Sequence, residues 1–60
     1  MDIFTKGKKL YNIDIYEGHT NWIAEVIPLD KPAAEPIFIA GQDRRALDLS
    51  LIREGFEPVA

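Results

Sequence analysis

The sequence contains no cysteine and a single histidine, His19. Disulfide bonds are therefore excluded, and a chain without thiols fits a reducing compartment. A structural zinc site is disfavoured because zinc takes its ligands from several cysteines and histidines. A glycine-rich phosphate loop, a Walker motif and a nucleophile elbow are also missing. We therefore expect no metal, no cofactor and no enzymatic activity, and we interpret His19 as a solvated residue in a glycine-containing turn.

Long apolar runs are missing as well. The longest apolar-rich segments are residues 22–29 and 36–41, far shorter than the ~20 residues of a membrane-spanning helix. The first residues do not show the apolar core of a signal peptide. We therefore expect a cytoplasmic protein that does not enter a membrane. Small accessory proteins of bacteria and phages often have this size and charge.

Positive charge is scarce. Ten acidic and seven basic residues give a formal net charge of −3, and residues 10–40 carry five acidic residues against one lysine. Nucleic-acid affinity depends on clustered lysine and arginine, so the acidic balance disfavours a nucleic-acid partner. A nucleic-acid-binding module is kept as the alternative function because two small basic groups are present. They consist of Lys6, Lys8 and Lys9 near the N-terminus and Arg44 and Arg45 further along.

Three segments have the pattern of β-strands. Apolar and polar residues alternate over residues 10–17, and a second β-prone segment covers residues 22–27. The turn residues between them predict a β-hairpin. Three prolines within residues 28–36 predict a stiff loop, and the short apolar segment 37–40 predicts a third strand.

The last element is predicted to be a helix over residues 44–54. Leu47, Leu49 and Leu51 alternate with polar residues as in a strand, but the flanking residues favour a helix. Asp43 is a good N-cap, and Gly55 stands where a helix commonly ends in a left-handed residue. The caps at both ends decide the assignment.

Together these elements predict a single α+β domain over residues 1–60. It consists of a three-stranded antiparallel sheet, formed by the hairpin and the third strand, followed by one C-terminal helix. A short extra strand is allowed at either end, because residues 56–59 read as extended and residues 1–9 read as a basic N-terminal arm or an edge strand.

Apolar residues occur on both sides of the predicted sheet and helix. A chain of this size buries only about 60% of the surface that it exposes when unfolded, so a partner that covers more of its surface would stabilise it. We therefore expect a non-enzymatic interaction or regulatory protein that acts as a homodimer or binds a protein partner. The predicted interface residues are Ile23, Ile27, Phe38, Leu49 and Ile52.

Two acidic residues, Asp14 and Glu25, are predicted to face each other across the hairpin. Paired carboxylates can serve glycoside hydrolysis when they line a cleft. A 60-residue domain has little room for one, so we interpret both residues as charges on the outer side of the sheet.

The segment Trp22-Ile23-Ala24-Glu25-Val26 resembles the second strand of plant three-stranded DNA-binding domains. The order of three strands and a helix is also similar to that of integrase arm-type domains and of HicB-type antitoxins. The arginines that the plant domains present to DNA have no counterpart here, since Asn12, Asp14 and Glu25 stand on the strands. The resemblance therefore implies a shared architecture and no site residues.

Overall fold

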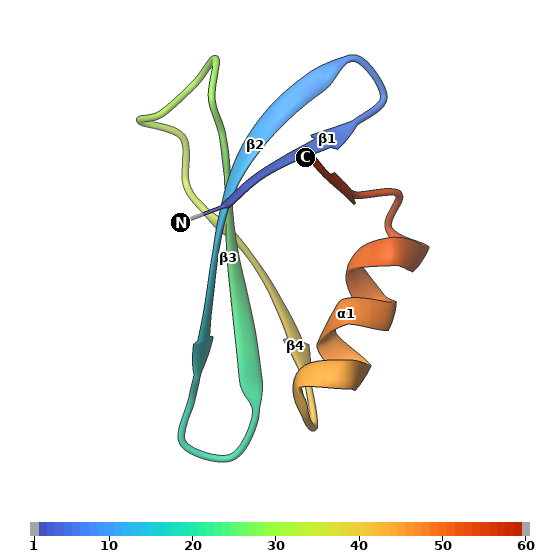
Figure 1. The fold of residues 1–60 in the computed structure, drawn as a ribbon. Coiled ribbons are helices and arrows are strands. Elements are labelled where there is room, and N and C mark those ends of the chain that lie inside the picture. Colours follow the sequence, from blue (N-terminus) through green and yellow to red (C-terminus); the bar gives the residue numbers. More distant parts are fainter. Residues whose placement is uncertain (1, 60) are drawn as a thin grey trace.

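Five strands form one antiparallel sheet, and a single helix crosses one of its faces (Figure 1). The computed structural model describes residues 2–59. The sheet order is β4-β3-β2-β1-β5. The elements are β1 (Asp2–Lys6), β2 (Lys9–Glu17), β3 (Trp22–Pro28), β4 (Ile37–Gly41), α1 (Arg44–Arg53) and β5 (Glu57–Pro58).

The predicted hairpin and third strand are confirmed. Strands β2 and β3 pair over seven residues, with Ile13 opposite Val26. The turn is closed by the Gly18 N–H, which donates to the Asn21 carbonyl at 2.6 Å. Strand β4 pairs with the outer side of β3.

The predicted three-stranded sheet is part of a five-stranded one, because the two ends of the chain, where the sequence allows a short extra strand, also pair. Strand β1 lies between β2 and β5, so residues 2–6 form neither an arm nor an edge strand. Burial of Phe4 in the core holds β1 in place, and Val59 N–H donates to the Ile3 carbonyl at 2.9 Å beyond β5. A strand as short as β5 has no periodicity of its own in the sequence.

Both predicted caps of α1 are confirmed. The Asp43 carboxylate accepts a hydrogen bond from the Ala46 N–H at 2.8 Å. At the other end Gly55 has φ of +94°, and its N–H donates to the Ile52 carbonyl. The Phe56 N–H donates to the Leu51 carbonyl, which completes a Schellman motif. The turn sends the chain back toward β1, where β5 forms.

The core lies between α1 and the sheet face that carries Trp22, Ala24 and Val26. Its fully or nearly buried members are Phe4, Ile13, Ala24, Val26, Leu47, Leu51 and Phe56. The single helix of residues 2–59 leaves the other face of the sheet uncovered (Figure 1). The helix packs mainly against β4 and β3 and then runs toward β5.

Gly41 allows the start of α1 to lie directly on the end of β4. A Cβ at this position would lie only 2.5 Å from the backbone nitrogen of Leu47. A side chain here would therefore have to push the helix away from the sheet. Within residues 2–59, no helix is long and apolar enough to cross a membrane.

Candidate interaction surfaces

Strand β4 forms one edge of the sheet, and no other strand of residues 2–59 lies on its outer side. Its sequence is Ile-Phe-Ile-Ala-Gly, and among the strands of residues 2–59 it alone contains no charged residue. Ile37 and Phe38 are 59% and 58% exposed. Edge strands in natural proteins are usually protected by charges, prolines or covering segments. None of these lies within β4.

The opposite edge has such protection. Strand β5 consists of two residues, Glu57 and Pro58. Proline has no N–H to offer to an added strand, and a charged, very short strand is a poor template for pairing. The two edges of the sheet therefore differ in their capacity to accept another strand.

The open face of the sheet carries apolar side chains around an acidic centre. Side chains alternate along each strand, so the residues that face away from α1 include the predicted interface residues Ile23, Ile27 and Phe38. Ile23 and Ile27 are half-buried and Phe38 is exposed. Between them Asp14 lies directly opposite Glu25, as the sequence predicted, and Glu25 pairs on its other side with Phe38.

Asn12 is a feature of this face that sequence reasoning missed. It pairs with Ile27 on one side and with Ile3 on the other. Its Oδ1 atom is buried and has no hydrogen-bond partner within the described residues. An amide at an alternating strand position gives no signal in the sequence that its oxygen will be enclosed by apolar neighbours.

The other two predicted interface residues lie on the helix. Leu49 is 47% exposed and points away from the sheet, opposite the buried Leu47 and Leu51, while Ile52 is 64% exposed. The structure therefore separates the five predicted residues into two surfaces, one on the open face and one on the helix. A single flat contact cannot include both.

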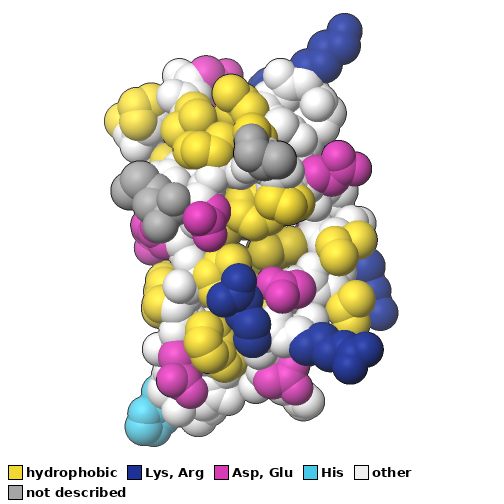
Figure 2. All heavy atoms as spheres, in the orientation of Figure 1, with side chains coloured by type: hydrophobic (Ala, Val, Ile, Leu, Met, Phe, Trp, Pro, Cys, Tyr) yellow, Lys and Arg dark blue, Asp and Glu magenta, His cyan; other side chains and the backbone are white. Residues whose placement is uncertain are grey.

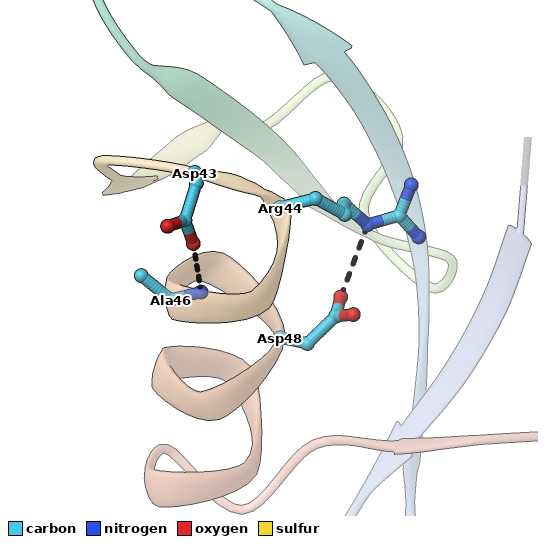
Figure 3. Close-up of polar contacts among 4 residues, drawn as sticks. All are labelled: Asp43, Arg44, Ala46 and Asp48. Carbon is cyan, nitrogen blue, oxygen red and sulfur yellow. Dashed lines mark hydrogen bonds and ion pairs between the residues drawn. The ribbon is translucent and has the colours of Figure 1, made fainter.

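A cleft of about 520 Å³ lies between α1 and the strands β1 and β5. In Figure 2 hydrophobic side chains gather between the strands and the helix. Arg44 and Asp48 lie beside the cleft and form an ion pair at 3.2 Å (Figure 3). The part of the lining that the structure describes contains no serine, histidine or lysine: it consists of Asp2, Ile3, Phe4, Arg44, Asp48, Leu51, Ile52, Phe56, Pro58 and Val59.

The predicted basic residues are not brought together. The lysines lie around the β1–β2 turn and the arginines at the start of α1, at opposite ends of the molecule (Figure 1). Lys6 lies 3.9 Å from the Glu54 carboxylate and 5.1 Å from the centre of the Phe56 ring. The Arg44 guanidinium, already paired with Asp48, lies 5.9 Å from the Trp22 ring centre.

Among residues 2–59, no group of three histidine or acidic side chains is placed to hold a metal ion. His19 is exposed in the loop between β2 and β3. Comparison with protein families, with curated proteins and with solved structures gave no match to this chain. What the protein does is therefore inferred from its own surfaces.

Proposed function

We propose that the protein is a small non-enzymatic interaction protein that acts as a homodimer in the cytoplasm. One observation carries the proposal: many large apolar side chains lie outside the small core. Within residues 2–59 seven residues form the core, whereas eight large apolar residues are more than 40% exposed. The exposed ones are Leu10, Tyr16, Leu29, Ile37, Phe38, Leu49, Ile52 and Val59.

Dimer formation would stabilise this protein strongly because the domain is small. Full burial of a side chain the size of leucine stabilises a protein by about 1.5–3 kcal/mol. Folded domains have a net stability of only about 5–15 kcal/mol, and short chains lie at the low end. Covering even part of the exposed set at a subunit interface would therefore contribute a sizeable fraction of the total stability.

The cleft supports an interaction protein better than an enzyme. Its two charged groups from the helix, Arg44 and Asp48, are engaged with each other. A catalytic site needs a nucleophile or a general base placed against the reacting group. Among the described residues that line the cleft, carboxylates are the only nucleophilic side chains.

The test is the mass of the protein in solution. Sedimentation equilibrium at micromolar concentration is expected to give twice the 6.8 kDa of one chain. The mass of a single chain across the micromolar range would overturn the proposal.

The alternative function, nucleic-acid binding, is tested by a gel-shift assay with duplex and single-stranded nucleic acid at low and moderate salt. Binding that weakens steeply with salt would favour nucleic-acid binding, and no binding at ~50 mM salt would eliminate it.

A further inference from the structure

We propose that two copies of the chain pair through β4, antiparallel and with the two-fold axis at Ile39. The two five-stranded sheets then continue into one another. This inference rests on the proposed homodimer and names the surface on which it forms. Three observations carry it: the free edge of β4, its lack of charge, and the order of large and small residues along it.

Among the exposed apolar surfaces, β4 is the one on which a two-fold contact brings no like charges together. In a two-fold interface a residue near the axis meets its own copy, so a charged residue there meets a like charge. On the open face Glu25 lies among the apolar residues, paired with Phe38 on one side, and a face-to-face dimer centred there would bring its carboxylate against its own copy. Strand β4 carries no charge that could repel its copy.

Like charges also disfavour a two-fold contact through the outer side of the helix, and here the charges are positive. Residues four apart lie above one another on a helix, which puts Leu49 between Arg45 and Arg53. All three are exposed. A two-fold contact centred on Leu49 would therefore bring the arginines of both copies close together.

The register follows from pairing the whole strand. With the axis at Ile39, Phe38 lies opposite Ala40 of the second copy, and Ile37 lies opposite its Gly41. Phe38 then meets a small residue on the open face, Ile37 lies beside the start of α1 of the second copy on the helix face, and all five residues of β4 are paired. Centring the axis on Phe38 would bring Pro36, which has no N–H, into the ladder opposite Ala40. Centring it on Ala40 would place Phe38 opposite Gln42, beyond the strand.

The helix layer leaves room for this arrangement. Paired residues of an antiparallel ladder point to the same side, so both helices lie on one face. Arg44, Asp48 and Ile52 point toward the cleft on the β1 side of α1. The opposite flank, above the β4 edge, carries the short side chains of Ala46 and Ser50, both half-buried, and ends at the exposed Arg53 in the last turn of the helix.

The first test places a charge on the proposed interface. Ala40 is exposed and lies in β4, so Ala40→Lys leaves the core untouched. We expect the dissociation constant of the dimer to rise about 100-fold, because the substitution occurs twice in the interface and each lysine weakens it about tenfold. Leu49→Lys is the matched control. It puts the same charge on an exposed apolar position of the helix and is expected to leave the dissociation constant unchanged.

A second test measures the register directly. The natural chain has no cysteine, so each introduced thiol is unique. Opposed Cα atoms of antiparallel strands lie about 4.5–5.5 Å apart, within the range that a disulfide spans. Ile39→Cys is therefore expected to give a cross-linked dimer on mild oxidation. Phe38→Cys and Ala40→Cys are expected to cross-link with each other when mixed, and Leu49→Cys is expected to remain uncross-linked.

The outcomes separate the inference from the proposed function. A dimer that withstands Ala40→Lys, or dissociates with Leu49→Lys, would overturn pairing through β4 and leave the homodimer standing. Cross-linking through Leu49→Cys but not Ile39→Cys would have the same meaning and would point to the helix. If the unsubstituted chain is a monomer, both the inference and the proposed function fail.

Discussion

Gly41 sets the distance between β4 and the start of α1. Its replacement by alanine would bring a methyl group to 2.5 Å from the Leu47 backbone nitrogen. Backbone cannot rotate away as a side chain can, so the helix itself must shift. We expect Gly41→Ala to lower the free energy of unfolding by about 1–3 kcal/mol, measured by urea denaturation at fixed protein concentration.

The control for this substitution is Gly18→Ala. Its added Cβ would come closest to the end of the Ile23 side chain, at 2.9 Å, and to Asn21 Oδ1 at 3.0 Å. Both atoms belong to side chains that can move, and the nearest backbone atom, the Asn21 oxygen, lies farther away at 3.1 Å, so we expect a smaller loss than for Gly41→Ala. Equal stability of the Gly41→Ala variant and the natural chain would contradict the close contact between β4 and α1.

Asp43 is the residue that starts the helix. Its carboxylate accepts the Ala46 N–H, one of the backbone donors that a helix leaves unpaired at its first turn (Figure 3). We expect Asp43→Ala to reduce the free energy of unfolding by about 1 kcal/mol. Asp43→Asn is expected to reduce it much less, because asparagine is a similarly good N-cap. Thermal unfolding followed by circular dichroism measures both. Equal losses for the two variants would show that the cap does not stabilise the helix.

At the scale of elements, Phe56 joins the end of the helix to the sheet. It is 6% exposed, and its ring meets that of Tyr11 edge-on with the centroids 5.2 Å apart. Strand β5 begins at the next residue, so the position of Phe56 also fixes where the chain pairs with β1.

Removing this ring should affect both layers. We expect Phe56→Ala to lower the free energy of unfolding by about 3–5 kcal/mol, close to the whole stability of so small a domain. Phe56→Leu keeps most of the apolar volume and is expected to lose less. Urea denaturation compares them, and a stable, cooperatively folded Phe56→Ala variant would show that the C-terminal segment is dispensable.

The elements that the sequence predicted are those with local signals. Alternation marked β2, prolines marked the loop before β4, and Asp43 with Gly55 marked the ends of α1. For β1 and β5 the sequence allowed a short strand at each end of the chain but did not predict their pairing, which depends on contact between the two ends. The buried face of the sheet was also undetermined, because β2 and β3 carry apolar residues on both faces.

The candidate surfaces could be predicted only in part. Ile23, Ile27 and Phe38 do lie on one face, since alternation fixes which residues of a strand point together. Their separation from Leu49 and Ile52 depends on where the helix crosses the sheet. The position of β4 at an edge depends on the strand order, which no local pattern encodes.

At the scale of the whole molecule, folding and association should be linked. Anything that binds the folded chain and not the unfolded one stabilises it by mass action, and a second copy is such a ligand. The thermal midpoint of the natural chain is therefore expected to rise as protein concentration increases tenfold from micromolar levels. In the Ala40→Lys variant the midpoint should be independent of concentration. A natural chain with a constant midpoint would contradict a dimer that forms in this range.

The unequal edges of the sheet also limit how large an assembly can become. Each copy offers one side to which a strand can be added, while Pro58 closes the other. When two copies join through β4, each copy covers the sheet edge of the other to which a strand could have been added. In the proposed dimer both outer edges of the combined sheet are β5 strands, so we expect pairing through β4 to give a finite pair and not a fibril.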